Sequence, residues 1–329
     1  MKSYKYTCIV DTIYSLLLYL IYHSCNNIQH TIFFVGSNIP DDIVVQLPNY
    51  VKVSSNKEDY DGKKKLLKKR WELFWKYRFC IMRTKLYAQD HLIFAPQLIC
   101  GQKYTFIEDA PRVFTLNKDN VIFRQNVPSD YKTRLWLKLY VGQVCGYKLG
   151  THRQCINRII SSAEDINSPL IAGKKFELVD RVQLWRKSSS QKKEYIKKIF
   201  GITDEILKTV SNANTIFFSQ PFIADCGLSE EEQYNIIVPY YERYKAEGFV
   251  IKPHPRDKFD YEKKFPESTI IKCKAPMQLL SMMGISFKRA ITVSSTAVSD
   301  LPPETELIWI GNSVNPKLVK ALGITKYKR

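Results

Sequence analysis

The second half of the chain alternates short apolar runs with longer segments that carry helix signals. The apolar runs predict buried strands at 215–218, 249–251, 268–271, 289–293 and 307–310. Between them, Ser229-Glu230-Glu231-Glu232 matches a capping box, and Gly248 ends the helix that this box begins. Further helices are predicted at 276–283 and 316–322. Strands that alternate with helices in this way predict a mostly parallel sheet.

The first half follows the same pattern less regularly. Its apolar runs predict strands at 6–10, 31–35, 51–53, 91–95 and 104–107. The apolar run from Ile13 to Tyr22 falls short of the ~20 residues that a bilayer span needs, and no small-residue cleavage site follows it. We therefore expect a buried helix there rather than a signal peptide or a membrane anchor. A strand followed by such a helix is typical of how an α/β domain begins.

A serine- and lysine-rich segment at 188–193 lies between the two halves. Its sequence, Ser-Ser-Ser-Gln-Lys-Lys, has the composition of a linker. The chain length of 329 residues also suits two domains of ordinary size. We therefore predict an N-terminal domain at 1–190 and a C-terminal domain at 191–329.

Composition then narrows the classes of partner. The formal net charge of +18 favours polyanionic partners, such as nucleic acid, anionic lipid or a phosphorylated small molecule. The lysines and arginines are dispersed, and no helix-turn-helix, RNP or zinc-finger signature is present, so specific nucleic-acid binding is not expected. Eight cysteines without a CxxC pair predict reduced, buried thiols in a cytoplasmic protein.

The most basic stretch of the chain, at 62–82, has two interpretations. Six cations between Lys63 and Arg70 precede an aromatic-rich remainder from Trp71 to Phe79. A helix of this kind can adsorb to an anionic membrane surface. Alternatively, it is a packed helix with a solvated charged end, because the linear pattern shows no clean split between apolar and charged faces. The sequence leaves both interpretations open.

Candidate chemistry centres on residues 249–257. The predicted strand runs directly into a Lys-Pro-His-Pro-Arg segment, whose basic members are Lys252, His254 and Arg256 and whose prolines restrict the backbone. In open α/β sheets, ligands bind outside the carboxyl ends of the strands. Two cations and an imidazole at that place suit a phosphate ester. The simpler alternative is a basic turn in a lysine-rich chain.

Polar groups also follow three other predicted strands. They are Glu108 and Asp109 after 104–107, Gln220 after 215–218, and Ser294, Ser295 and Thr296 after 289–293. The paired acids can provide a general base, or they can simply favour the dipole of a following helix. Hydroxyl and free N–H groups at a helix N-terminus can bind an anion. If the strand ends of each half face the other half, all these groups converge on one interdomain cleft.

Taken together, these segments resemble motifs of bacterial sialyltransferases, in particular those of glycosyltransferase family 52. Residues 252–265, with Lys-Pro-His-Pro-Arg-Asp and an Asp-Tyr tail, resemble the HP motif. Residues 107–110 resemble the acidic motif, 293–297 the serine motif, and Ser-Gln-Pro at 219–221 a Thr-Gln-Pro stretch. The order and spacing of the motifs agree over most of the chain, and the HP motif is the most specific of them.

The resemblance implies a GT-B-like α/β fold, in which two Rossmann-like domains with mostly parallel sheets face an interdomain cleft. It implies CMP-sialic acid as the donor, Asp109 as the general base on the acceptor hydroxyl, and His254 as the group that assists the leaving phosphate. Glu108 would lie on the acceptor side, and Asp225, which also follows a strand end, is a reserve base. The expected donor-binding residues are Gln220, Lys252, Pro255, Arg256, Gln278, Ser294, Ser295 and Thr296.

Two positions depart from the family pattern. Ala110 stands where the acidic motif usually has glycine, and Gln278 stands where an acid that touches the cytidine in related enzymes is common. The second departure leaves open a family 52 transferase that uses another nucleotide sugar, such as a hexose donor. Two non-enzymatic alternatives also remain, a basic protein of the membrane surface and a nucleic-acid-binding protein.

We expect a bacterial cytoplasmic glycosyltransferase, peripheral on the inner face of the cell membrane. It would move sialic acid to a galactoside-type acceptor of a capsule or lipooligosaccharide. No DxD motif or His/Cys cluster predicts a metal site, so no cofactor is expected beyond the nucleotide-sugar co-substrate. The expected partners are the nucleotide sugar, the glycan acceptor and an anionic membrane, and a homodimer is left open.

Overall fold

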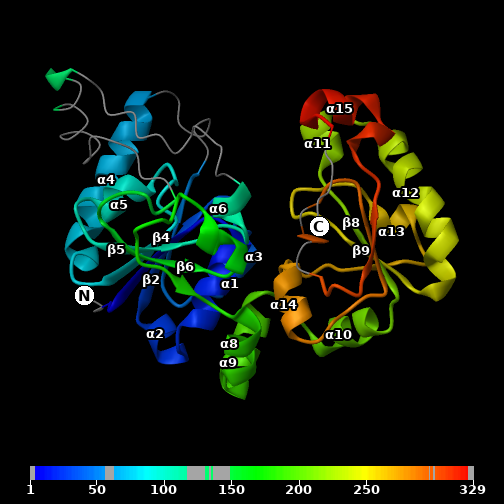
Figure 1. The fold of residues 1–329 in the computed structure, drawn as a ribbon, viewed down its shortest axis with the longest axis horizontal. Helices are drawn as coiled ribbons and strands as arrows, with labels where there is room; N and C mark the ends of the chain where they lie inside the picture. Colours follow the sequence, from blue (N-terminus) through cyan, green and yellow to red (C-terminus); the bar gives the residue numbers. More distant parts are fainter. Residues whose placement is uncertain are drawn as a thin grey trace. The chain divides into compact units, whose positions relative to one another are not determined.

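The structure, a computed structural model, divides into two compact units, Met1–Ile199 and Phe200–Arg329, here called unit 1 and unit 2 (Figure 1). Each unit contains one parallel β-sheet with helices packed on it. The structure describes residues 4–55, 63–116, 130–132, 135, 149–295, 297–298 and 301–324. The predicted α/β class, with two mostly parallel sheets, is therefore confirmed.

Unit 1 contains a seven-stranded sheet in the order β3-β2-β1-β4-β5-β6-β7. All neighbouring strands pair in parallel. The strands are β1 (Tyr6–Val10), β2 (Thr31–Gly36), β3 (Tyr50–Val53), β4 (Lys85–Ala88), β5 (Tyr104–Ile107), β6 (Cys155–Ile160) and β7 (Glu177–Leu178). The central strands are largely apolar because helices cover both faces of a parallel sheet.

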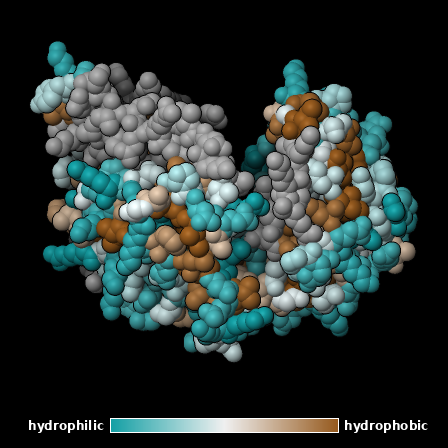
Figure 2. Space-filling view, in the orientation of Figure 1, coloured by the Kyte–Doolittle hydropathy of each residue, from teal (hydrophilic) through white to brown (hydrophobic). Residues whose placement is uncertain are grey.

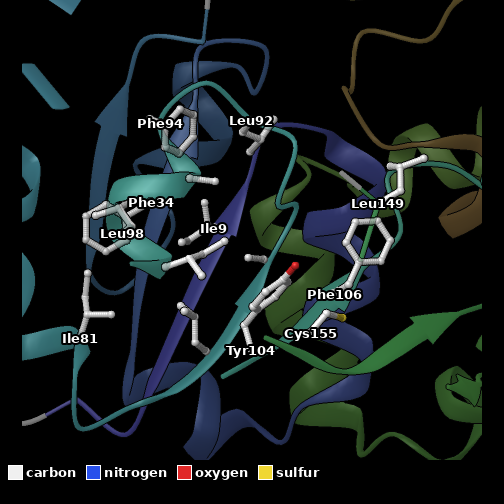
Figure 3. Packing of buried hydrophobic residues seen from close by; sticks show 14 of the residues in the cluster. Ile9, Phe34, Ile81, Leu92, Phe94, Leu98, Tyr104, Phe106, Leu149 and Cys155 are labelled. Carbon is white, nitrogen blue, oxygen red and sulfur yellow. The ribbon is translucent and has the colours of Figure 1, made fainter. Parts of the chain in front are cut away.

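The two faces of this sheet pack against different helices. Alternate residues of a strand point to opposite faces, so Phe33 and Phe34 of β2 separate. Phe33 contacts Tyr19 of α1 (Ile13–Tyr22), with ring centroids 5.5 Å apart. Phe34 contacts Tyr77 of α4 (Lys63–Ile81), with centroids 5.0 Å apart. The core under α4 and α5 (Ala95–Ile99), which includes Phe34 and Leu98, is drawn in Figure 3.

Helices α8 (Arg181–Lys187) and α9 (Ser190–Ile199) place the end of unit 1 beyond the predicted domain boundary at residue 190. The serine-rich segment at 188–193 is not a linker but the start of α9. Ser189 Oγ accepts a hydrogen bond from Lys192 N, at 3.3 Å, as a capping serine does. Lys192 Nζ donates to Ile21 O in α1, at 2.6 Å, so α9 belongs to unit 1.

Smaller helices complete unit 1. They are α2 (Cys25–Gln29), α3 (Asp41–Val44), α6 (Val113–Leu116) and a 3-10 helix at Ala163–Asn167. In the part of the chain that the structure describes, no helix combines the length and the apolar character that a membrane crossing requires. The seven cysteines in that part are all free thiols.

Unit 2 contains a five-stranded parallel sheet in the order β10-β9-β8-β11-β12. The strands are β8 (Thr215–Phe218), β9 (Phe249–Lys252), β10 (Thr269–Ile270), β11 (Arg289–Thr292) and β12 (Glu306–Trp309). The helices are α10 (Asp204–Ser211), α11 (Phe222–Cys226), α12 (Glu230–Tyr244), α13 (Tyr261–Lys264), α14 (Met277–Met282) and α15 (Pro316–Leu322), with 3-10 turns at Lys245–Glu247 and Asn312–Val314. Every strand predicted in this half is confirmed.

The predicted capping box of α12 is also confirmed. Glu232 N donates to Ser229 Oγ, at 3.1 Å, and Ser229 N donates to the Glu232 carboxylate, at 2.7 Å. The helix then packs on β9, where Tyr241 contacts Phe249 with ring centroids 5.7 Å apart. Gly248 adopts a φ of 84°, a left-handed value that favours glycine, and it reverses the chain into β9.

The first five strands of unit 1 and the five strands of unit 2 share one order. In each, the first strand has the second and third on one side and the fourth and fifth on the other. The direction of the connections therefore reverses between β1 and β4 in unit 1 and between β8 and β11 in unit 2. Ligands of open α/β sheets bind in the crevice outside the strand ends at such a switch point.

The predicted strand at 91–95 is wrong. These residues form a turn that leads into α5, and the strand of this region is β4, at Lys85–Ala88. The apolar side chains of Leu92 and Phe94 are buried in the core under α5, which explains the misleading pattern. A short apolar run alone cannot separate a strand from a buried turn or helix start. Strand β6 (Cys155–Ile160) was not predicted at all.

Candidate functional site

The histidine loop of unit 2, residues 253–257, is tied to the neighbouring strand by one serine. Ser219 follows β8, and its Oγ accepts a hydrogen bond from His254 N at 3.0 Å. The same hydroxyl donates to Asp257 Oδ2 at 2.6 Å. Ser219 thus joins both ends of the loop after β9 to the end of β8. The loop is fixed by side chains as well as by its two prolines.

Asp257 is the second anchor of the histidine loop. Its carboxylate also accepts hydrogen bonds from Tyr261 OH, at 2.7 Å, and from Phe259 N, at 3.2 Å. Burial, together with the charge of Asp257, raises the pKa of Tyr261 well above its usual range. Neither Asp257 nor Ser219 was predicted as a site residue. Their positions inside the HP-like and Ser-Gln-Pro segments were the only sequence features that could have indicated a role for them.

The imidazole of His254 is half-buried at the carboxyl end of β9. Its Nδ1 accepts a hydrogen bond from Arg256 N at 3.2 Å, so the neutral ring carries its proton on Nε2. Burial, followed by the nearby cation of Arg256, lowers the pKa of His254. At neutral pH the ring is therefore a neutral donor through Nε2–H.

Arg256 and Asp225 form a bidentate ion pair at the surface. Arg256 Nη1 lies 2.9 Å from Asp225 Oδ1, and Nη2 lies 2.8 Å from Oδ2. Both oxygens of the predicted reserve base are thereby engaged by one guanidinium. The pair links α11 to the histidine loop, and it neutralises the arginine that was predicted to bind the donor.

The switch point of unit 2 is bridged by a direct side-chain contact. Ser294 Oγ, after β11, donates to Gln220 Oε1, after β8, at 2.6 Å. Ser295 N donates to Thr292 Oγ1 at 2.9 Å, which forms the turn that leaves the strand. On the other side of β8, burial lowers the pKa of the Lys252 ammonium, which lies at the end of β9. The predicted residues Gln220, Lys252, His254, Ser294 and Ser295 therefore lie at the ends of three adjacent strands.

Three predicted donor-binding residues remain, and the structure describes two of them. Pro255 is exposed in the histidine loop, and Gln278 is half-buried in the first turn of α14. Thr296 lies outside the described residues. Within the described ranges, no group of three or more His, Cys, Asp or Glu side chains is arranged to hold a metal ion.

In unit 1, Asp109 follows β5 and faces a histidine that follows the neighbouring strand β4. Its Oδ2 lies 3.6 Å from Nε2 of His91, which follows β4, and each side chain is about one quarter to one third exposed. Asp109 Oδ1 is buried and has no hydrogen-bond partner among the described residues. The backbone carbonyl of Asp109 accepts from Thr12 Oγ1 at 3.3 Å. Asp109 Oδ1 therefore has an unfilled hydrogen-bond acceptor position inside the protein, and Oδ2 faces His91.

Glu108 lies beside Asp109 in sequence but has a different environment. It is fully buried, and its Oε1 accepts a hydrogen bond from Tyr14 OH at 2.6 Å. Tyr14 OH also lies 2.6 Å from Ser161 Oγ, after β6. Burial raises the pKa of Glu108 to about 7, although these hydrogen bonds oppose the shift. The acid predicted for the acceptor side is thus an internal group that holds the ends of β5 and β6 to α1.

Four further polar residues at this edge, Asp11, Asn38, Gln89 and His91, were not predicted as site residues. Gln89 Oε1, after β4, accepts from Asp11 N, after β1, at 2.5 Å, across the switch point of unit 1. Asp11 in turn accepts hydrogen bonds from Asn38 N and Nδ2. His91 was hidden because the strand before it was misplaced. A Cβ on Gly36 would lie 1.8 Å from Asp11 Oδ1, so only glycine leaves room for this carboxylate.

The two edges offer complementary chemistry. The edge of unit 1 presents a carboxylate that can accept a proton, and the edge of unit 2 presents a neutral imidazole donor, an ammonium group and two serine hydroxyls. A general base and an anion-stabilising group are the two components that displacement of a phosphate leaving group requires. The predicted convergence of both edges on one interdomain cleft stays a prediction.

Known proteins with similar sequences include the members of one glycosyltransferase family and one bacterial relative. The family model of glycosyltransferase family 52 matches residues 115–317. An uncharacterized protein of Haemophilus influenzae strain Rd is 24% identical over 327 residues, which cover 98% of this chain and 100% of the relative.

Among solved structures, a 2,6-sialyltransferase of Photobacterium sp. JT-ISH-224, in complex with CMP and lactose, matches with a TM-score of 0.62 and 13% identity, over 93% of this chain and 71% of that chain. An α/β-galactoside α-2,3-sialyltransferase of Photobacterium phosphoreum matches with a TM-score of 0.57 and 14% identity, over 98% and 95%. A UDP-GlcNAc 2-epimerase of Methanocaldococcus jannaschii, in complex with UDP-GlcNAc and UDP, matches with a TM-score of 0.54 and 14% identity. The match covers 98% of this chain and 93% of that chain.

The two parallel sheets and these neighbours define the GT-B fold class. The family match covers more than half of the chain, and this protein belongs to glycosyltransferase family 52. The family inferred by resemblance is thus confirmed, and the match includes the HP-like and serine segments. The acidic segment at 107–110 lies outside the matched residues, so its assignment stays a prediction. The fold alone does not select the nucleotide, because structures with CMP and with UDP both share it.

The environment of His254 predicts that its imidazole titrates below the ordinary value of about 6.5. Burial and the cation of Arg256 both oppose protonation. Replacement Arg256→Gln removes the cation and should raise the pKa of His254, which NMR of the imidazole Hε1 proton can follow. Arg243→Gln, which removes an exposed arginine of α12, is the matched control and should leave this pKa unchanged. A midpoint at or above 6.5 in the unmodified protein would contradict this account.

The environment of Glu108 predicts a pH-dependent penalty on stability. Its folded-state pKa is raised to about 7, so between about pH 4.5 and 7 the unfolded chain ionises while the folded protein must stay protonated. The free energy of unfolding should therefore fall as pH rises through that window, by up to about 3 kcal/mol. Glu108→Gln keeps an acceptor for Tyr14 and removes the ionisation, so it should flatten this dependence.

Urea denaturation at pH 5 and pH 8 measures the effect of Glu108→Gln. Glu194→Gln removes an exposed carboxyl of α9 in the same unit and serves as the control, with the slope of the unmodified protein expected. Equal pH slopes in Glu108→Gln and the unmodified protein would show that Glu108 is not held protonated.

Proposed function

We propose that this family 52 glycosyltransferase is a sialyltransferase that uses CMP-sialic acid and a galactoside-type acceptor. The observation that carries the proposal is the group of donors at the ends of β8, β9 and β11. There, His254 presents Nε2–H, and Ser294 is held by Gln220 across the switch point. A neutral donor and hydroxyls at this position suit a phosphate that gains charge as it leaves.

In the proposed reaction, the Asp109 carboxylate accepts the proton of the acceptor hydroxyl. The hydroxyl oxygen forms the new bond to the anomeric carbon of the donor sugar, and the bond from that carbon to the phosphate oxygen of CMP breaks. The electron pair of the broken bond stays with CMP. His254 Nε2–H and the hydroxyl of Ser295 stabilise the added charge, and Lys252 adds a positive potential. The hydroxyl of Ser294 would join them by turning from Gln220 to the phosphate. The step is proposed to need no metal ion or other cofactor.

The other residues then have supporting roles. Ser219 and Asp257 hold the histidine loop through the backbone of His254 and through Tyr261. Arg256 and Asp225 brace the same loop, so Asp225 is not the base that this proposal prefers. The acceptor is proposed to be a capsular or lipooligosaccharide glycan of a bacterial surface, glycosylated in the cytoplasm at the inner face of the membrane.

A second donor class remains a candidate because of Gln278. It occupies the first turn of α14 in place of the acid that is common in the family. An amide can contact other bases or riboses than a carboxylate does. A hexose carried by another nucleotide is therefore the competing proposal, and it would use the same Asp109 and His254.

Substitution of the candidate base tests the mechanism most directly. Asp109→Asn should abolish transfer, because the acceptor hydroxyl loses its proton acceptor, and His254→Ala should lower kcat by ~10²–10³ because the leaving phosphate loses a stabilising donor. Release of CMP from CMP-sialic acid, with lactose as the acceptor, measures both effects, and mass spectrometry identifies the product.

Asp225→Asn provides the matched control, since it neutralises the reserve carboxylate in the same way. We expect it to retain activity within about tenfold, because an exposed ion pair contributes little stability. If Asp225→Asn loses transfer and Asp109→Asn keeps it, the base is Asp225 instead. If the unmodified protein turns over another nucleotide sugar but never CMP-sialic acid, the donor assignment is wrong and the family assignment stands.

A further inference from the structure

Helix α4 resolves the ambiguity that the basic, aromatic stretch at 62–82 presented in the sequence. One face of the helix is packed, with Leu73 and Ile81 buried in the core of unit 1 and Tyr77 against Phe34. Arg78 Nη1 also donates to Cys100 O, at 2.8 Å, next to α5. The packed face accounts for only some of the aromatic residues of the helix.

The opposite face carries a row of apolar side chains, most of them exposed. It consists of Trp71, Trp75 and Phe79 of α4 and Met82 directly after it, at spacings of four, four and three residues, which keeps them on one side. Trp71 is half-buried. Trp75 is 63% exposed, Phe79 74% and Met82 51%. The ring of Trp71 stacks on that of Trp75, with centroids 6.0 Å apart. We call these four residues the aromatic stripe.

The exposure of apolar side chains alone would not distinguish α4 from other surface segments of the protein. Hydrophobic residues reach the surface of both units on the face drawn in Figure 2, and single exposed apolar residues are normal in globular proteins. The aromatic stripe differs because its members are large, adjacent and aligned along one helix. Such a contiguous patch indicates an interaction surface.

Cations border the aromatic stripe. Residues 63–83 contain nine lysines or arginines and a single acid, Glu72. The carboxylate of Glu72 lies 3.4 Å from Lys69 Nζ, so it is already paired within the helix. Lys65, Lys68, Lys69, Lys76 and Arg83 are all exposed. Bulky aromatic side chains flanked by cations complement the interface of a bilayer with anionic headgroups.

We infer that the outer face of α4 is a docking surface for an anionic membrane. Trp75 and Phe79 would enter the interfacial region, and the neighbouring lysines would contact the headgroups. A nucleic acid also attracts cations, but base stacking requires splayed bases in a groove, whereas this stripe lies along one outer helix face. The planar lipid surface is the occupant that a convex helix face fits.

The topology places the basic beginning of this surface at the same edge of the sheet as the candidate base. Strands β3 and β4 belong to one parallel sheet, so the helix that connects them must run back across it. The basic beginning of α4 therefore lies towards the carboxyl edge of the sheet, which also carries Asp109. A membrane held there would present a lipid-linked acceptor to that edge. This last step rests on the proposed function, whereas membrane docking itself does not.

Vesicle sedimentation with the full chain tests the inference. The protein should sediment with vesicles that contain phosphatidylglycerol and much less with phosphatidylcholine alone, and added salt should weaken the binding. Trp75→Ala with Phe79→Ala should lower partitioning into the anionic vesicles at least ~10-fold, because the interfacial anchors are lost. Lys65→Gln with Lys68→Gln and Lys69→Gln should lower it as well.

A matched control removes the same number of positive charges from other helices. Lys187, Lys198 and Lys208 are exposed on α8, α9 and α10, and their joint replacement by Gln should leave vesicle binding close to that of the unmodified protein. Thermal midpoints should agree among all variants, since the substituted side chains are exposed. Transfer to soluble lactose should be unchanged in the Trp75→Ala, Phe79→Ala protein, which separates this inference from the proposed reaction.

The inference is overturned by any of three results. The first is the absence of binding of the unmodified protein to anionic vesicles. The second is equal binding by the α4 variants and the control, which would indicate attraction by net charge alone. Binding of single-stranded DNA, lost in the α4 lysine variant and accompanied by no vesicle binding, would assign the surface to nucleic acid instead.

Discussion

The parallel order of the two sheets is the constraint on which the rest of the structure depends. Because helices cover both faces of each sheet, the central strands are largely apolar, and the candidate polar side chains follow where a strand ends. The reversal of connections beside β1 and β8 then gathers those ends into crevices. The hydrogen bonds from Asp11 to Gln89 and from Ser294 to Gln220 each cross such a reversal. The candidate chemistry of both units follows from this arrangement.

Within unit 2, side chains remove most of the freedom of the histidine loop. Ser219 contacts the start and the end of the loop, and Asp257 gathers it against Tyr261. The backbone of Arg256 fixes the tautomer of His254, while its side chain is neutralised by Asp225. The loop therefore presents one oriented neutral donor, and rigid orientation is what an electrostatic stabiliser of a leaving group requires. The family match and the fold support a glycosyltransferase, and this local rigidity suits the proposed role of His254.

The sequence predicted the strands of unit 2, the capping box of α12 and the family, because local pattern and motif agree there. It failed at 91–95, where buried apolar residues line a turn, and at 188–193, where serines begin α9 instead of a linker. The first error concealed His91, since that residue becomes a candidate only when β4 is known to end before it. The environments of Glu108 and Asp225 could not be predicted from the sequence either, because they depend on burial and on partners distant in the chain.

Calorimetric titration of the full chain with free nucleotides tests the central claim, that the ends of β8, β9 and β11 bind the phosphate of a cytidine nucleotide. The account predicts that CMP binds without added metal, that UDP, GDP and ADP bind much more weakly, and that Ser294→Ala with Ser295→Ala weakens CMP binding at least ~10-fold while Asp109→Asn does not. Preferential binding of UDP or GDP, or CMP binding that is indifferent to the serine substitutions, would contradict it.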